Sequence, residues 1–247
     1  MSRSALSSSL LAIAMLGPLA CAHAQGTSGL KPLDDAELSA TWGQALLDLT
    51  NTQQGGYDFS RVTLNADITL SASLKGLVLG SKADGSSDIN ISMLNFGRSD
   101  STDAARTVSI TNPYFEWVYS GTDVVGMRFG FNGIAGDVGL LMNTVSGSLS
   151  LSTTSGTVSG TGSQLTSLSG TGGTTALSAI GGVTAGTSDG ASRDFFLSVL
   201  KNALTWTNVG GLPSATAQSG FWLNWTDRLA ALNTTGTVPP NTPKVGP

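Results

Sequence analysis

Residues 62–74 alternate between apolar and polar side chains without interruption, and this pattern limits the chain's fold more than any other feature of the sequence. Such strict alternation predicts a β-strand with one apolar face and one polar face. A strand of this length exceeds the usual five or six residues, so we expect a bend or a long ribbon here. The apolar positions are Val62, Leu64, Ala66, Ile68, Leu70, Ala72 and Leu74.

The same period of two returns further along the chain, at residues 89–93, 108–110, 117–119 and 127–131. Turn-forming residues separate these runs, at 83–86, 112–113, 120–123 and 132–133. Short alternating runs between turns are typical of antiparallel strands. The sequence therefore predicts a mainly β fold, either an antiparallel meander or an elongated, solenoid-like stack of strands, with at most one or two short helices.

Two segments are ambiguous. Residues 34–49 begin with paired Asp residues ahead of Ala36 and Leu38, which favours a short helix that Gly43 interrupts. Residues 193–206 place apolar side chains on one helical face, yet Phe195, Leu197 and Val199 also alternate as in a strand. We favour a helix for 193–206, with a strand as the alternative.

Residues 145–191 are rich in Ser, Gly and Thr. Residues 145–157 and 158–171 are nearly duplicated, which suits a stack of short strands, a flexible linker or a simple hairpin of small residues. Residues 172–191 are expected to form a Gly-rich loop. Residues 237–247 hold several Pro residues and are expected to form a disordered tail.

The first 24 residues have the features of a secretory signal peptide. Arg3 is followed by the apolar run 10–16 and by Ala22-His23-Ala24, which predicts cleavage before Gln25. The alternative is a lipoprotein signal at Cys21, although the residues before it form a poor lipobox. We therefore expect an exported protein, periplasmic, outer-membrane-associated or extracellular, with a single β-rich domain over residues 25–236.

Removal of the signal peptide would leave a chain without Cys or His, because the sequence holds one of each and both precede Gln25. Such a chain has no Ser-His-Asp triad, thiolate nucleophile or His-ligated zinc. Only carboxylates remain as acid/base groups, and we predict no enzyme activity, catalytic residue, metal or cofactor. The net charge of −4 argues against nucleic acid as a partner. No mature segment is apolar for long enough to form a transmembrane helix.

Leu33–Gln44 reads L-D-D-A-E-L-S-A-T-W-G-Q and follows soon after the predicted signal peptide. This stretch resembles the opening of an uncharacterised family of exported β-rich proteins of Gram-negative proteobacteria, which begin with Leu-Asp-Asp-x-x-Leu and end the motif in Gly-Gln. The similarity continues, in the family's order, through residues 57–68, 91–98, 110–119, 124–131 and 136–141, and more weakly through 192–200 and 219–225.

This chain departs from the family pattern at Thr41-Trp42, where members usually have Val-Thr, and lacks the C-terminal Cys residues that many members carry. The resemblance implies export and a β architecture, and it brings no known activity or site residue.

Two groups of residues are candidates for a particular role. Glu116 and Arg128 each interrupt an apolar strand, and a hairpin would place them close enough for a cross-strand ion pair; the alternative is that both point to solvent. Six aromatic residues fall between positions 195 and 225. Among them Phe221, Trp222 and Trp225 are expected either to cap the apolar core or to form a contact surface.

The leading functional hypothesis is an exported, non-enzymatic β-sheet protein that serves as a structural or cell-surface component of the Gram-negative envelope, through self-association or contact with other envelope components. The alternative is a binding module that holds a lipid or a glycan on its apolar sheet face or its aromatic residues.

Overall fold

The computed structural model describes residues 46–206, 212 and 215–242, so the predicted signal peptide, with Cys21 and His23, lies outside the described residues. The described residues belong to one compact unit, Thr41–Pro247. They form strands and two short 3-10 helices, which confirms the predicted mainly β fold. The strands are β1 (Leu47–Gln54), β2 (Tyr57–Leu64), β3 (Asp67–Leu70), β4 (Ala72–Ser81), β5 (Ser87–Phe96), β6 (Val108–Ser120), β7 (Asp123–Thr153), β8 (Gly156–Leu165), β9 (Ser167–Gly170), β10 (Gly173–Ala176), β11 (Gly182–Ala185), β12 (Phe196–Leu200), β13 (Leu204–Trp206), β14 (Ala215–Ala217), β15 (Gly220–Trp225) and β16 (Leu229–Ala231), and the 3-10 helices are η1 (Asp103–Arg106) and η2 (Leu177–Ala179).

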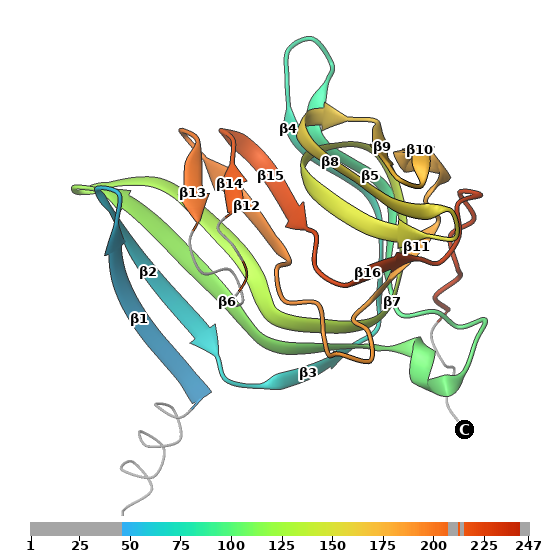
Figure 1. Ribbon diagram of the computed structural model, residues 1–247. Helices are drawn as coiled ribbons and strands as arrows, with labels where there is room; N and C mark the ends of the chain where they lie inside the picture. The colour runs from blue at the N-terminus through green and yellow to red at the C-terminus, as the bar shows by residue number, and fades with distance from the viewer. Residues whose placement is uncertain (1–45, 207–211, 213–214, 243–247) are drawn as a thin grey trace, which may run out of the picture. The chain divides into compact units, whose positions relative to one another are not determined.

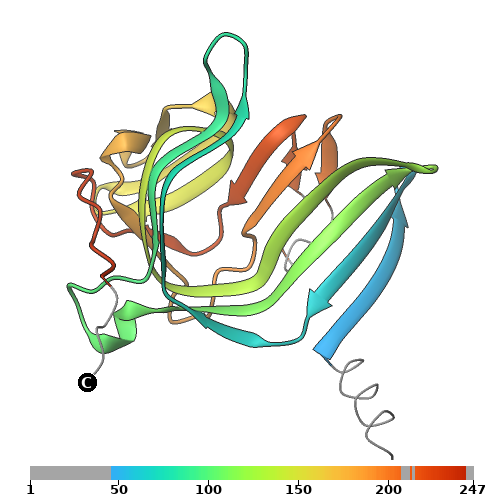
Figure 2. The same cartoon turned by 180° about the vertical axis from the view of Figure 1, so that it is seen from behind.

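Strand β7 is 31 residues long and organises the large sheet (Figure 1). From its beginning to its end it pairs in turn with β6, β5 and β8, all antiparallel. It also pairs antiparallel with β12 and β11, and in parallel with β15 and β16. Because β12 and β15 also pair with each other, they bridge the first and last parts of β7, which curves strongly between them (Figure 2).

Two glycines allow this curvature and closure. Gly136 has a φ of 125°, a backbone conformation that residues with side chains rarely adopt. Gly147 lies where β15 approaches β7 in parallel, and a Cβ atom built on it would be 2.2 Å from the Leu223 carbonyl oxygen. A side chain at position 147 would therefore push β15 away from β7.

Two of the four predicted turns are present and two are not. Residues 83–86 connect β4 to β5, and residues 120–123 connect β6 to β7. In contrast, Asn112-Pro113 lies inside β6 and Asn132-Gly133 lies inside β7, at facing positions of the ladder. Asn112 has a φ of 46°, so the local turn preference produces an irregularity within the strand. The ladder continues on both sides because its pairing outweighs the preference of one dipeptide.

The predicted continuous strand over residues 62–74 is divided among β2, β3 and β4. Strands β2 and β3 pair with successive parts of β6, whereas β4 leaves that line to pair with β5. The break at residue 71 therefore marks a change of partner strand.

Residues 193–206 form no helix, so the favoured interpretation was wrong and the strand alternative holds. Strand β12 lies between β7 and β15, and other side chains pack against both of its faces. Apolar residues are then needed on both faces, and this produces a pattern that also matches a helix. In the other ambiguous segment, residues 34–45 lie outside the described part of the chain and β1 begins at Leu47.

The Ser/Gly/Thr-rich segment forms the last part of β7 and strands β8, β9 and β10, which are antiparallel neighbours. The hairpin interpretation is therefore the correct one for its first half. The predicted loop 172–191 instead contains β10, η2 and β11, and Leu177 and Ile180 in it are fully buried.

Residues 237–242, which were predicted to belong to a disordered tail, instead make ordered contacts with the sheet. The Asn95 side chain donates to the Pro239 carbonyl over 2.9 Å, and the Asn241 side chain donates to the carbonyls of Ala72 and Phe96. These contacts attach the segment to β4 and β5. Residues 243–247 lie outside the described residues.

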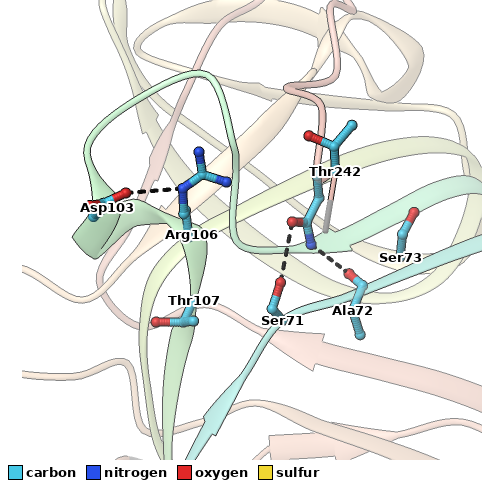
Figure 3. Close-up of a pocket in the computed structure, with 8 residues that line it drawn as sticks. Ser71, Ala72, Ser73, Asp103, Arg106, Thr107 and Thr242 are labelled. Carbon is cyan, nitrogen blue, oxygen red and sulfur yellow. Dashed lines mark hydrogen bonds and ion pairs between the residues drawn. The ribbon is translucent and has the colours of Figure 1, made fainter. Parts of the chain in front are cut away.

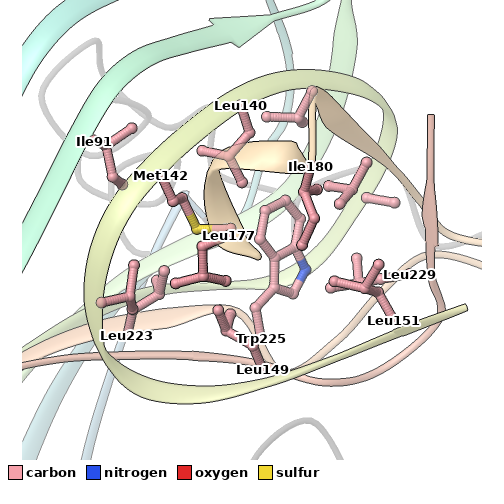
Figure 4. Close-up of a cluster of buried hydrophobic side chains, with 14 of the residues drawn as sticks. Ile91, Leu140, Met142, Leu149, Leu151, Leu177, Ile180, Leu223, Trp225 and Leu229 are labelled. Atoms are coloured by element: carbon pink, nitrogen blue, oxygen red, sulfur yellow. The ribbon is translucent and has the colours of Figure 1, made fainter. Parts of the chain in front are cut away.

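Two apolar clusters stabilise the fold. The first core lies within the curve of β7 (Figure 4), and the second lies beneath the separate two-stranded sheet of β13 and β14. The first core includes Ile91, Leu140, Met142, Leu149, Leu151, Leu177, Ile180, Leu223, Trp225 and Leu229. The second core comprises Phe59, Val118, Phe196, Leu200, Leu204, Trp206, Ala217 and Trp222.

The close approach at Gly147 leads to a stability prediction. We expect Gly147→Ala to lower the free energy of unfolding by about 1–3 kcal/mol, because the added methyl group forces β15 away from β7. Gly162→Ala is the matched control, since Gly162 faces Gly147 across the β7–β8 ladder and its added Cβ would meet only a Leu165 side-chain atom at 3.4 Å. Urea denaturation of the two variants measures the difference, and equal stabilities would contradict the proposed role of this contact.

Candidate functional site

A cavity of about 570 Å3 opens on one face of the large sheet, and every residue that lines it is apolar. We call it the apolar cavity. Strands β3 to β7, β12 and β15 contribute to its wall, together with Phe195 just before β12. The lining residues are Ile68, Leu70, Leu74, Leu77, Leu79, Ile89, Ile91, Leu94, Phe96, Ile110, Pro113, Phe115, Phe129, Phe131, Val138, Leu140, Phe195, Leu197, Leu223 and Trp225.

The alternation that predicted an apolar strand face also indicates part of this wall. Ile68, Leu70 and Leu74 all line the apolar cavity, although they belong to two different strands. Ile68 and Leu74 are exposed, as is Phe115 on β6. Exposed apolar side chains that also line a cavity mark its mouth, so the entrance lies at β3, β4 and β6.

A continuous row of aromatic rings forms one side of the cavity. Successive ring centroids from Phe115 through Phe129, Phe131 and Phe195 to Trp225 are 4.9 to 5.1 Å apart. Contacts at this spacing are favourable and hold the rings in fixed orientations. The indole N–H of Trp225 donates to the Ser192 hydroxyl over 3.0 Å, so this polar group is already paired.

The predicted aromatic candidates lie on both sides of β15. Trp225 lines the apolar cavity, and Phe221 packs partly buried against the first core. Trp222 points to the opposite face and is buried in the second core. Adjacent residues can both be covered here because β15 has a core on each side, an arrangement that the sequence argument, which assumed two layers, did not include.

The predicted cross-strand ion pair is present on the opposite face of the sheet from the apolar cavity. Glu116 on β6 faces Arg128 on β7 in the ladder, and Arg128 Nε donates to Glu116 Oε2 over 2.5 Å. The two residues are only 5% and 2% exposed. The alternative, that both point to solvent, is therefore wrong.

Sequence analysis missed a third member of this group. Arg61 on β2 also faces Glu116, and its Nε donates to Glu116 Oε1 over 2.9 Å. Each carboxylate oxygen of Glu116 thus accepts from a different arginine. The available signal was that Arg61 interrupts the strand Tyr57–Leu64 as Glu116 and Arg128 interrupt theirs.

Aromatic rings enclose the two guanidinium groups. The Arg61 guanidinium lies 4.1 Å from the ring centroid of Tyr114, and that of Arg128 lies 4.2 Å from the Trp206 ring. Cation–π contacts of this kind stabilise a partly desolvated cation. Burial raises the pKa of Tyr114 above its ordinary value, while the positive charges of Arg128 and Arg61 oppose that rise.

Arg61, Arg128 and Trp206 border a pocket of about 450 Å3, which we call the arginine pocket. The edge strand β1 supplies one wall and Trp206 of β13 supplies another. Its lining residues are Thr50, Thr52, Gln53, Gln54, Phe59, Arg61, Glu116, Arg128 and Trp206.

A third pocket, of about 690 Å3, lies between η1, the start of β4 and the C-terminal segment (Figure 3). Asp103 and Arg106 form an exposed ion pair within η1 at its rim. The Asn241 side chain accepts from Ser71 and donates to Ala72 across its floor. The bonds of Asn241 attach the C-terminal segment to residues 71–72.

Several other carboxylates are held in local contacts. Asp88 accepts from Lys82 and from the Phe221 backbone, and Asp137 accepts from Thr184. The Arg98 guanidinium lowers the pKa of Asp100. In the part of the chain that the structure describes, no three His, Cys, Asp or Glu side chains gather where they could bind one metal ion.

Comparison of the chain with known proteins found no matching family model, no matching curated protein and no matching solved structure. Among residues 46–206, 212 and 215–242, no helix combines the length and hydropathy needed to span a membrane.

The arrangement around Glu116 leads to a second stability prediction. Glu116→Ala leaves Arg128 buried without its counter-charge, and we expect a loss of about 3–5 kcal/mol in the free energy of unfolding. Asp103→Ala is the control, because it removes a carboxylate from an exposed ion pair and should change stability by less than about 0.5 kcal/mol. Thermal and urea denaturation provide the test. A Glu116→Ala variant as stable as the control would show that the buried pair contributes little.

Proposed function

We propose that this protein is an exported lipid-binding module whose apolar cavity holds the acyl chain of an amphiphile. The observation that carries the proposal is the wall of that cavity, which is apolar throughout. Its volume lies within the roughly 300–1,000 Å3 range of small-molecule sites. Each methylene group that leaves water for such a wall contributes about 0.8 kcal/mol, so an acyl chain of moderate length would bind well.

The same wall disfavours a glycan as the occupant of this cavity. Sugar hydroxyl groups that leave water need hydrogen-bond partners, and leaving one unpaired costs about 1–3 kcal/mol. The twenty lining side chains supply no such partner, because the only polar group among them, the Trp225 indole N–H, already donates to Ser192. Of the two ligand classes that the sequence suggested, the geometry supports the lipid.

Export and an envelope location enter the proposal from the sequence. The features of residues 1–24 support a secretory signal, and the resemblance of residues 33–44 supports a place among the exported β-rich proteins of Gram-negative bacteria. A non-enzymatic role agrees with the composition of the cavity wall, which carries no ionisable side chain.

The earlier leading hypothesis, a structural component that self-associates, has one specific observation in its favour. Every residue of β1 is exposed, and within the described residues β1 pairs only with β2. Leu49 on this edge strand is 72% exposed. Uncovered edge strands can pair with another chain.

Sedimentation analysis of the wild type and of Leu49→Lys tests self-association through β1. If the edge strand drives assembly, the wild type will form concentration-dependent oligomers that the added charge reduces. A wild type that stays monomeric at all concentrations would remove this second candidate.

A charge at the mouth of the cavity tests lipid binding without disturbing the core. We expect Leu74→Glu to weaken the binding of a fluorescent long-chain fatty acid at least about tenfold, equivalent to about 1.4 kcal/mol, because the carboxylate would face the acyl chain. Val78→Glu is the matched control on the same strand: Leu74 and Val78 are 48% and 47% exposed, but only Leu74 lines the cavity. Fluorescence titration measures both affinities.

Two outcomes would contradict the proposal. One is that no fatty acid, in a series from short to long chains, binds saturably to the wild type. The other is an equal loss of affinity in Leu74→Glu and Val78→Glu, which would place the bound probe on the general surface rather than in the cavity.

A further inference from the structure

The lining of the arginine pocket holds two arginines and one carboxylate. Arg61 and Arg128 share a single carboxylate, Glu116, through their Nε atoms. Among the charged residues that line the pocket, two guanidinium groups thus face one carboxylate, and the buried Asp194 is a second negative charge that acts on Tyr114 beside both arginines. Both residues line it, and the side chain of Arg61 is 22% exposed and therefore within reach of a solute.

Several hydrogen-bond donors around this group of charges have no acceptor among the described residues. They are Arg128 Nη1, the Ser198 hydroxyl and the indole N–H groups of Trp206 and Trp222. Arg128, Ser198 and Trp222 face one another across β7, β12 and β15, so these donors belong to one region of one sheet face. A buried donor without a partner costs about 1–3 kcal/mol. A molecule that brings acceptors would recover part of this free energy.

The two strands that cover this region are held by side-chain packing and not by pairing with the large sheet. Strands β13 and β14 form a separate two-stranded sheet, and side chains such as Leu204 and Trp206 hold it against the second core. Trp206 both covers Arg128 and lines the arginine pocket. An occupant of the pocket would therefore lie beside both the Trp206 ring and Arg128.

We propose that the arginine pocket binds a small organic anion through a carboxylate or phosphate group. Two arginines in the lining favour an anion, the unpaired guanidinium and indole N–H groups require acceptors, and planar guanidinium groups suit both kinds of oxyanion. Thr50 and Thr52 add hydroxyl groups on the β1 wall, and the volume of about 450 Å3 leaves space for an organic portion beyond the oxyanion.

This site is independent of the proposed lipid site. Neighbouring residues in a strand point to opposite faces of a sheet. On β6 and β7, Glu116 and Arg128 border the arginine pocket while Phe115 and Phe129 line the apolar cavity. One amphiphile cannot place its acyl chain and its head group in both, so either proposal can fail without the other.

Titration of the full chain with acetate and with inorganic phosphate, at constant ionic strength and with glycerol as a neutral control, tests the proposal. We expect at least one of the two anions to raise the melting temperature and to bind saturably by calorimetry, and glycerol to do neither. Arg61→Gln should weaken that binding at least about tenfold, because it removes the accessible positive charge. Arg106→Gln is the matched control, since Arg106 is a partly exposed arginine that pairs with one carboxylate in a different pocket.

A second variant tests the site without removing a charge. Trp206→Phe keeps an aromatic ring over Arg128 but removes an unpaired indole N–H, and we expect the bound anion to perturb the fluorescence of the wild type more than that of this variant. Absence of binding by either anion to the wild type would overturn the proposal. Equal affinities in Arg61→Gln, Arg106→Gln and the wild type would overturn it as well.

Discussion

The pairing of β7 along both of its edges is the constraint on which the rest of the structure depends. Backbone N–H and C=O groups of a strand inside a sheet need partners, and neighbouring strands supply them along both edges of β7 in its first, middle and last parts. Strands β12 and β15 do so by bridging its first and last parts, and Gly147 permits the close parallel approach of β15. The curve that results encloses the first core and, continuous with it, the apolar cavity. The cavity is thus a direct consequence of how β7 closes.

The sequence predicted which face of the sheet a residue lies on better than it predicted where strands begin and end. Ile68, Leu70 and Leu74 do share an apolar surface, and Glu116 does meet Arg128, because both predictions depend only on the period of two in a strand. The turn expected at Asn132-Gly133 and the helix expected over 193–206 were wrong because both depend on neighbours distant in sequence. A dipeptide with a turn preference stays extended when β6 pairs on both sides of it. Strand β12 resembles a helix in sequence because it is covered on both faces.

The apolar cavity and the arginine pocket could likewise each be predicted only in part from the sequence. The apolar wall could be foreseen in part, since it uses alternating strand residues, but its closure by Leu223 and Trp225 depends on the parallel pairing of β15 with β7. For the arginine pocket, sequence reasoning found the central pair and missed Arg61 and Trp206, which reach it from β2 and β13. One pair of strands, β6 and β7, therefore carries an apolar site on one face and a charged site on the other.

The position of β12 and β15 late in the chain also determines when the fold can be completed. The last part of β7 lacks its second neighbour until residues 220–225 are available, some 75 residues further along the chain, as the pairing of Gly147 with Leu223 shows. Contacts between residues so distant in sequence slow folding, because the intervening chain must lose its freedom before the pairing stabilises it. If the N-terminal part of the chain emerges first, the apolar inner surface of β7 stays exposed until residues 220–225 have emerged too. The architecture therefore favours completion of the fold only after nearly the whole polypeptide is present in one compartment.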